Sequence, residues 1–352
     1  MRNPADIEAR GPLTRRLFLQ RSAAALAASG GGALLNACGG AHIPAGNALT
    51  FLTVLPLTSL TFAPELLADA GGYFADQGLE VTFQSTRGTA QAIQLVLAGS
   101  APLTRIGQIE AIGHAANRGA PLVNVGTVSK ISTIRFVSSA AAPLGEPQDF
   151  TGKTVGIPSE GGESEITLDL LLSASGIDPE RVNRQVVGLG PGVFNLVEQG
   201  RIAGYAVSID TAKILEQQRP GIHVLSPGDF IASGAQAYTT SAESLAPSRE
   251  IIRKYLEAVH AALSFMIADD GFDETLRIMR QKYSFGTLED TGIAKESLRE
   301  YVHVWTSEGM ENVLRTVPEN WQRSYAELVA AGQAEAGKNP AEWFTNELVP
   351  AS

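Results

Sequence analysis

Short apolar segments alternate with amphipathic helical segments in two successive series along this chain. Glycine and proline punctuate the short connections between them. Strands that alternate with helices in this way form parallel or mixed sheets with helices on their faces, so the sequence predicts an α/β fold built on two sheets. The expected strands are 49–55, 79–83, 121–128, 134–137, 153–157, 186–188, 205–209 and 222–225, and the expected helices are 64–70, one that opens at Thr89, 163–175 and 192–199.

From Ser248 onward the pattern is almost entirely helical. Apolar residues recur at helical spacing over 251–266, 274–282, 295–306 and 319–336. The sequence therefore predicts a helical C-terminal tail. The apolar content of 44% is enough for one large α/β unit or for two lobes.

The N-terminal segment is typical of an export signal. Arg15-Arg16 is followed by a weakly hydrophobic run of small residues that ends at Leu35-Asn36-Ala37-Cys38. This pattern resembles a twin-arginine signal over 1–37 with a lipoprotein cleavage box before Cys38. The run is too short and too weakly apolar to span the ~30 Å hydrocarbon core of a bilayer. We expect lipid on Cys38, a flexible tether over 38–48, and a mature protein outside the cytoplasmic membrane.

Charge and cysteine content exclude several function classes. Residues 1–37 hold five arginines, Asp6 and Glu8, a net charge of +3, so their removal takes the chain from −10 to −13. An acidic protein of this kind is a poor nucleic-acid binder, because contact with phosphates needs clustered Lys and Arg. Cys38 is the only cysteine, which excludes an intrachain disulfide and a cysteine-based metal or redox centre. The five histidines lack metal-ligand spacing, and we expect neither a metal nor a cofactor.

Three polar segments follow predicted strands, where open α/β sheets place their ligands. They are a hydroxyl-rich turn over 57–62, a glycine turn over 86–89 and a glycine-rich loop over 159–165. Free backbone N–H groups at helix starts are ready donors for a ligand, although the same residue types also serve as helix caps. The candidate ligand-binding residues in these segments are Thr58, Ser59, Thr61, Arg87, Gly88, Ser159, Glu160, Gly162, Ser164 and Glu165.

Catalytic motifs are lacking in the sequence. The glycine-rich segment 188–192 has neither the lysine of a phosphate loop nor the spacing of a dinucleotide-binding loop, and no Gly-x-Ser-x-Gly motif is present. We therefore expect a protein that is not an enzyme.

Four further segments resemble one known family. Residues 72–81 match a "GYF-x-x-x-GL-x-V" signature, 152–158 a "GK-x-VG" strand, 161–165 a ligand loop and 343–350 a "YTNEFLP" ending. In this order they resemble type II periplasmic substrate-binding proteins of the branch that serves ABC importers of nitrate, sulfonates, taurine and thiamine-pyrimidine precursors. The resemblance covers roughly residues 49–350.

The resemblance implies a two-lobed clamp that closes on a small solute and then docks on the membrane subunits of an ABC permease. Lobe 1 would take 49–137, lobe 2 would take 138–240, and 241–352 would return to lobe 1 as the helical tail. The chain would cross between lobes near 136–139 and 238–241. We expect a monomer without a cofactor.

Two further residues, Asp210 and Gln108, are candidate ligand residues. Relatives often carry an acidic residue in a segment that reads 200–205 here, and this stretch has no carboxylate. Asp210, a few residues on, is the candidate substitute. Gln108 is the second added candidate.

The solute class is an open question at this stage. Glu160, Glu163 and Glu165 oppose the positive helix end that an anion site needs, which favours a neutral or amine-bearing solute such as an aminopyrimidine over sulfonate or nitrate. Cationic side chains of the clamp would favour an anion instead if they face the cleft, and the candidates are Arg87, Arg105 and Lys130.

Two other functions stay open beside the importer. One is an enzyme related to thiamine-pyrimidine synthases, which share this fold but carry a cysteine-rich motif that a chain with one cysteine cannot supply. The other is a sensor ectodomain that presents a solute to a signalling partner.

Overall fold

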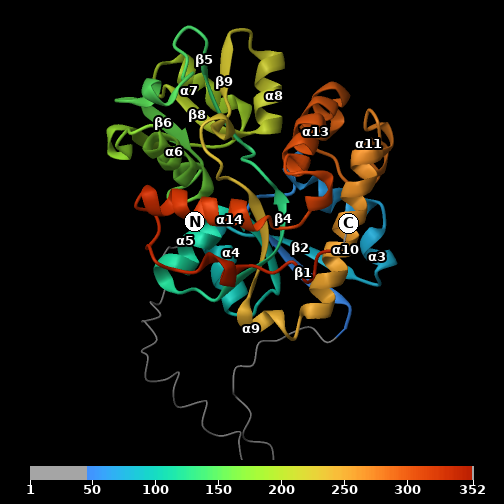
Figure 1. The fold of residues 1–352 in the computed structure, drawn as a ribbon. Coiled ribbons are helices and arrows are strands. Elements are labelled where there is room, and N and C mark those ends of the chain that lie inside the picture. Colours follow the sequence, from blue (N-terminus) through green and yellow to red (C-terminus); the bar gives the residue numbers. More distant parts are fainter. Residues whose placement is uncertain (1–45, 351–352) are drawn as a thin grey trace, which may run out of the picture. The chain divides into compact units, whose positions relative to one another are not determined.

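The computed structural model describes residues 46–350. The predicted export segment, Cys38 and most of the predicted tether lie outside the described residues. Two five-stranded sheets organise the described chain, each with helices packed around it (Figure 1). Within the described range, no helix is long and apolar enough to cross a membrane.

The first sheet has the order β2-β1-β3-β10-β4. β1 pairs in parallel with β2 and β3, and β10 runs antiparallel to β3 and β4. We call this sheet and its helices lobe 1. Its strands are β1 (Ala48–Thr53), β2 (Glu80–Ser85), β3 (Leu103–Gly107), β4 (Leu122–Ser129) and β10 (Gln236–Ser241), and its helices from the first half of the chain are α2 (Ala63–Ala70), α3 (Tyr73–Asp76), α4 (Thr89–Leu97) and α5 (Gln108–Arg118).

The second sheet has the order β7-β6-β8-β5-β9. β6 pairs in parallel with β7 and β8, and β5 runs antiparallel to β8 and β9. We call this sheet and its helices lobe 2. It comprises β5 (Ile134–Ser139), β6 (Thr154–Ile157), β7 (Asn183–Val186), β8 (Gly204–Ser208) and β9 (Ile222–Leu225), with α6 (Glu163–Ala174), α7 (Phe194–Glu198) and α8 (Ile209–Gln218).

The chain passes between the sheets twice, at positions that differ from the predicted boundaries. β5 lies wholly in the second sheet, so the first passage is 130–133 rather than 136–139. β10 lies wholly in the first sheet, so the second passage is 226–235 rather than 238–241. The apolar pattern of 134–139 is the same whichever sheet it joins, which is why the sequence misplaced the boundaries.

The strand β3 and the helices α5 and α8 were not predicted. Their patterns are interrupted by polar residues that the fold buries, among them Arg105, Gln108, Glu110 and Asp210. The glycines of the segment 72–81 have a simple conformational role: Gly72 and Gly78 both have positive φ, at 82° and 66°. Their left-handed conformation suits glycine at the two turns that flank α3.

Stacked aromatic rings hold the core of lobe 1 together. Tyr255 lies between Phe51 and Phe74, with ring centroids 5.1 and 5.0 Å apart. Phe51 belongs to β1 and Tyr255 to α10, so the contact joins the sheet to the C-terminal half of the chain. The remaining helices are α9 (Ala242–Leu245), α10 (Arg249–Ala268), α11 (Asp273–Met279), α12 (Gly286–Glu289), α13 (Thr291–Thr306) and α14 (Pro318–Ala330).

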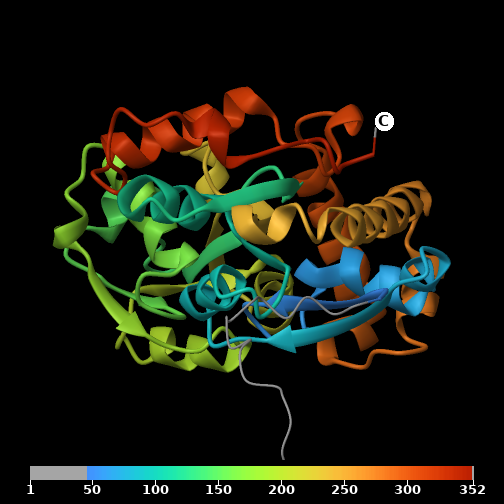
Figure 2. The same ribbon diagram turned by 90° about the horizontal axis from the view of Figure 1, so that it is seen from below.

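The helical tail contacts both lobes. α13 packs Tyr301 and Trp305 into the lobe 1 core. α14 lies against α5 of lobe 1 and α6 of lobe 2, where Trp321 joins Ile112 and Leu170 in one apolar cluster. The chain then runs back beside β4, and Phe344 bridges to Asn124 (red segment in Figure 2).

Removal of the Phe51 ring should destabilise lobe 1 severely. The ring is fully buried, and Phe51→Ala would leave a cavity between the sheet and α10. We expect the free energy of unfolding to fall by about 3–5 kcal/mol in urea denaturation. Phe230, whose ring is 41% exposed, provides the control, since Phe230→Ala should change it by less than about 0.5 kcal/mol. An equal effect of the two substitutions would contradict this account of the core.

Candidate functional site

Polar segments from the two lobes meet where the strands of both sheets end. Ser59, which follows β1, donates to Asp210 at the start of α8 over 3.1 Å. Gln236, at the start of β10, donates from Nε2 to Glu163 at the start of α6 over 3.2 Å. We call the region defined by these contacts the interlobe junction. The topology thus brings together chain segments that are far apart in sequence.

A buried ion pair forms the lobe 1 side of the junction. Arg105 on β3 donates from Nη1 to both carboxylate oxygens of Glu65, each over 3.1 Å. Its other N–H groups reach Thr61 and the amide oxygen of Gln236. Burial acts to lower the pKa of Arg105, but the Glu65 carboxylate outweighs it and raises the pKa. The guanidinium of Arg105 is therefore saturated by protein acceptors.

Two carboxyl groups face one another across the lobes. Glu110 on α5 accepts hydrogen bonds at Oε2 from Gly107 N–H and Thr89 Oγ1, over 3.1 and 3.0 Å. A Cβ added at Gly107 would lie 3.0 Å from that oxygen and 3.0 Å from Cγ of Glu163. The absence of a side chain at Gly107 is therefore what lets the two acids approach.

The surroundings of this pair resist ionisation. Burial, and then the nearby Glu163 charge, raise the pKa of Glu110 to about 8. Burial raises the pKa of Glu163 to about 7, against the opposing influence of Gln236 and Arg105. Each acid also keeps one buried oxygen, Oε1, that has no hydrogen-bond partner among residues 46–350.

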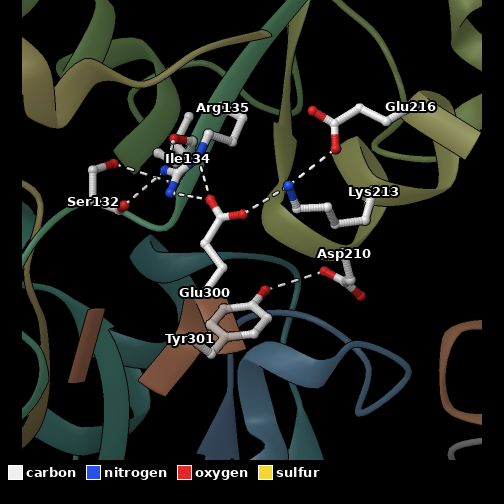
Figure 3. Close-up of polar contacts among 8 residues, drawn as sticks. All are labelled: Ser132, Ile134, Arg135, Asp210, Lys213, Glu216, Glu300 and Tyr301. Atoms are coloured by element: carbon white, nitrogen blue, oxygen red, sulfur yellow. Dashed lines mark hydrogen bonds and ion pairs between the residues drawn. The ribbon is translucent and has the colours of Figure 1, made fainter. Parts of the chain in front are cut away.

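A second set of contacts ties lobe 2 to α13 (Figure 3). Arg135 on β5 donates to Oε1 of Glu300 over 2.9 and 2.5 Å, and Lys213 on α8 lies 3.1 Å from Oε2 of the same carboxylate. Lys213 also pairs with Glu216 over 3.0 Å. Burial acts to raise the pKa of Glu300, but Arg135 and Lys213 outweigh it and lower the pKa. We call Arg135, Lys213 and Glu300 the closure latch.

Asp210 makes a further contact between the lobes, beside the closure latch. Its carboxylate accepts from Ser59 Oγ, from Leu60 N–H over 3.3 Å and from Tyr301 Oη over 3.1 Å. Three donors from lobe 1 and its tail therefore converge on one acid of lobe 2. These contacts hold the lobes in the closed arrangement that the structure shows.

A hollow of about 190 Å³ adjoins Glu110. One face of α5 lines it with Glu110, His114 and Arg118, while Gly161 of lobe 2 and Leu328 of α14 form other walls. Burial lowers the pKa of His114. Parts of both lobes and of the tail line this hollow, and it adjoins the carboxyl pair at Glu110.

The predicted ligand residues do not all lie in one place. Ser59, Thr61 and Asp210 lie in the interlobe junction, and Gln108 is buried there with its N–H bonded to Ala235 O over 2.8 Å. Gly88 caps α4 and Gly162 caps α6, and Ser164 is buried on the first turn of α6. Thr58, Arg87, Ser159 and Glu160 are exposed, and Glu165 binds Gly161 N–H and lies 3.7 Å from Arg184.

The three cations that would favour an anion differ in their surroundings. Arg105 lies at the junction, where its donors are taken up by protein acceptors, as described above. Lys130 donates to the backbone carbonyls of Thr127 and Arg315, and burial lowers its pKa to about 7. Arg87 is exposed, and its backbone N–H binds Gln91.

Several residues at the junction were not predicted. Glu110 sits on a helix that the sequence analysis did not identify, and Glu163 was considered only as a charge at a helix end. Gln236, Glu300 and Tyr301 come from elements far along the chain, and no local motif marks them. Within the described range, no group of three or more His, Cys, Asp or Glu side chains could hold a metal ion.

A family model described as NMT1/THI5 like matches residues 59–270, more than half of the chain. The chain belongs to this family. Solved structures agree on the fold: the alkanesulfonate-binding protein SsuA of Xanthomonas axonopodis pv. citri, bound to MOPS, superposes with a TM-score of 0.62 at 13% identity, over 85% of this chain and 98% of that one. This likeness shows the two-lobed fold of periplasmic binding proteins.

Named relatives of this NMT1/THI5-like chain bind different solutes. The riboflavin-binding protein RibY of Chloroflexus aurantiacus is 28% identical over 302 residues, 84% of each chain. The formylaminopyrimidine-binding protein of Halalkalibacterium halodurans is 31% identical over 122 residues, 35% of this chain and 36% of that one. One relative is an enzyme, the 4-amino-5-hydroxymethyl-2-methylpyrimidine phosphate synthase THI13 of Saccharomyces cerevisiae, which is 24% identical over 220 residues, 58% of this chain and 63% of that one.

The stability that the closure latch contributes should depend on the carboxylate of Glu300. Glu300→Ala would leave Arg135 and Lys213 without their shared carboxylate, and because the Glu300 side chain is 25% exposed we expect a loss of only about 1–2 kcal/mol in unfolding free energy. Since the pKa of Glu300 is lowered in the fold, this contribution is present above pH 4.5 and is lost as the pH falls through the lowered value. Urea denaturation at pH 7 measures this loss of unfolding free energy, and the same measurement at pH 3.5 shows how the loss depends on pH.

The exposed Glu296 on the same helix provides the matched control. Glu296→Ala should stay within about 0.5 kcal/mol of the wild type at both pH values. A Glu300→Ala loss that persisted undiminished at pH 3.5 would show that packing, rather than charge, holds this contact.

Proposed function

We propose that this protein is the extracytoplasmic solute-binding component of an ABC importer. In this proposal it is exported by a twin-arginine signal, anchored through lipid on Cys38, and monomeric. It closes its two lobes on one small polar solute and delivers that solute to permease subunits. The carrying observation is the interlobe junction, where polar side chains of both lobes converge at the ends of the two sheets.

The charge of the junction supports a neutral or amine-bearing solute over sulfonate or nitrate. An anion needs a free cation or unopposed helix N-termini. Arg105 is already saturated, while Glu110 and Glu163 each keep a free carboxyl oxygen. A nitrogen heterocycle with N–H donors, of aminopyrimidine type, fits this pattern. Relatives named for riboflavin and formylaminopyrimidine bind solutes of a similar kind.

Binding experiments test the solute class directly. We expect native mass spectrometry of freshly purified protein to detect a retained solute. We also expect calorimetry to show tighter binding of 4-amino-5-hydroxymethyl-2-methylpyrimidine or riboflavin than of taurine or an alkanesulfonate. X-ray scattering should show compaction with the solute that binds. Tight binding of a simple sulfonate would overturn the preference, and flat calorimetry with unchanged scattering for every solute would overturn the clamp itself.

The similarity to THI13 favours an enzyme as the second candidate. The sequence speaks against it, because the cysteine-rich motif of such synthases cannot be built from one cysteine. Turnover of pyridoxal phosphate by the purified mature protein would decide for the enzyme. A sensor ectodomain would instead be indicated by a neighbouring receptor gene in place of permease genes.

A further inference from the structure

The carboxyl pair Glu110–Glu163 has features that helix capping does not explain. The cap uses Oε2 of Glu110, through Gly107 N–H and Thr89 Oγ1, and the backbone N–H of Glu163 also acts to lower the pKa of this carboxyl. Its Oε1 is buried without a hydrogen-bond partner in the described part of the chain, and the residue is only 3% exposed. An unpaired buried acceptor is costly, so it is expected to have a partner in the working protein.

Glu163 of lobe 2 resembles Glu110 in how its two carboxyl oxygens are paired. Glu163 uses Oε2 to accept from Gln236, and its Oε1 is likewise buried and unpaired within the described residues. The two side chains meet over Gly107. Glu110 of lobe 1 and Glu163 of lobe 2 thus each bring one unsatisfied acceptor to the contact between the lobes, and Glu110 also lines the hollow.

The groups that favour ionisation of the pair do not outweigh burial. Thr89 Oγ1, Gly107 N–H and the backbone N–H of Glu163 act to lower the pKa of Glu110, and Gln236 and Arg105 act to lower that of Glu163. Arg105 lies behind Gln236 with all its donors in use. His114 and Arg118 line the hollow on the same helix, and Arg118 is exposed. The other walls bring no further titratable side chain, since they are Ile109, Gly113, Asn117, Gly161, Ile166, Leu328 and Gln333.

We propose that Glu110 and Glu163 form the binding site for a protonated amine of the solute, which the two lobes grasp together. This proposal rests on the proposed function and names the group that the clamp recognises. An ammonium group has three N–H donors and no acceptor, so two of them match the two unpaired oxygens. The empty clamp instead closes with a proton held between the acids, and the arriving ammonium releases that proton to the solvent.

Proton binding by the two acids predicts how closure of the empty protein changes with pH. Both acids have raised pKa values in the closed structure, about 8 for Glu110 and about 7 for Glu163, against an ordinary value of 4.5. The closed empty state is therefore favoured most below pH 4.5, and the advantage is lost as the pH rises through 7 to 8. A bound ammonium should remove this dependence, because it stabilises the ionised pair.

The first experiment needs no solute. X-ray scattering of the empty wild-type protein should show a more open particle at pH 8.5 than at pH 5.5, and Glu110→Gln should lose most of this change. The exposed Glu243 gives the control, since Glu243→Gln should keep the wild-type change. Lys130 and His114 titrate in all three proteins, so comparison between variants cancels them. An equal pH response of wild type and Glu110→Gln would overturn the proposal.

The second experiment uses a matched pair of probes. In calorimetry at pH 7, 4-amino-5-aminomethyl-2-methylpyrimidine should bind the wild type at least about tenfold more tightly than its 5-hydroxymethyl counterpart, because only the former adds an ammonium group. Two buffers of different ionisation enthalpy should reveal the release of a proton. Glu110→Gln and Glu163→Gln should each abolish the preference and the release, while Glu243→Gln keeps both.

The outcomes separate this proposal from the proposed function. If another solute such as riboflavin or taurine binds, and both glutamine variants bind it equally well, the clamp stands and the amine site is wrong. If the aminomethyl probe has no advantage in the wild type, the amine site is again wrong. If no solute binds at all, the proposed function fails, and the scattering of the empty protein alone decides whether the carboxyl pair holds a proton.

Discussion

The buried ion pair of Glu65 and Arg105 sets the chemistry of the interlobe junction. A guanidinium this deep in the protein must be paired, and Arg105 finds acceptors for all its donors within lobe 1 and β10. The pairing leaves no positive charge to meet a ligand. The junction also holds three acids, Glu110 from α5, Glu163 from α6 and Asp210 from the start of α8.

Two opposing interactions then determine how readily the lobes close. The closure latch favours closure, because Arg135 and Lys213 of lobe 2 share the Glu300 carboxylate of the tail. The pair Glu110–Glu163 opposes closure whenever both acids are ionised. In the clamp that we propose, these two contacts oppose each other, and a solute shifts the equilibrium between open and closed states through its differential affinity for them.

The sequence predicted the broad architecture well because that architecture rests on local patterns. The alternation of strands and helices, the glycine turns around 72–78 and the helical spacing after Ser248 are all encoded within short windows. The boundaries of the lobes were misplaced because strand pairing is not local. The region of β5 was predicted as a strand and that of β10 only as a crossing between lobes, and only the fold shows which sheet each strand joins.

The candidate site was harder to predict for a related reason. Glycine loops and hydroxyl-rich turns drew attention to residues such as Ser159 and Glu160, which the fold leaves exposed. The groups that meet at the junction, such as Glu110, Gln236 and Tyr301, lie on regular elements where nothing in the flanking sequence marks them. Buried polar side chains inside helices and strands also weakened the very periodicity by which β3 and α5 would have been recognised.

The position of α14 has a mechanical consequence. Trp321 of this helix packs with Ile112 of one lobe and Leu170 of the other, so a rotation that separated α5 from α6 here would expose all three to water. Separation of α5 from α6 therefore has a cost that does not depend on pH, and this cost opposes the repulsion between the ionised carboxyl groups of Glu110 and Glu163 at the same interface.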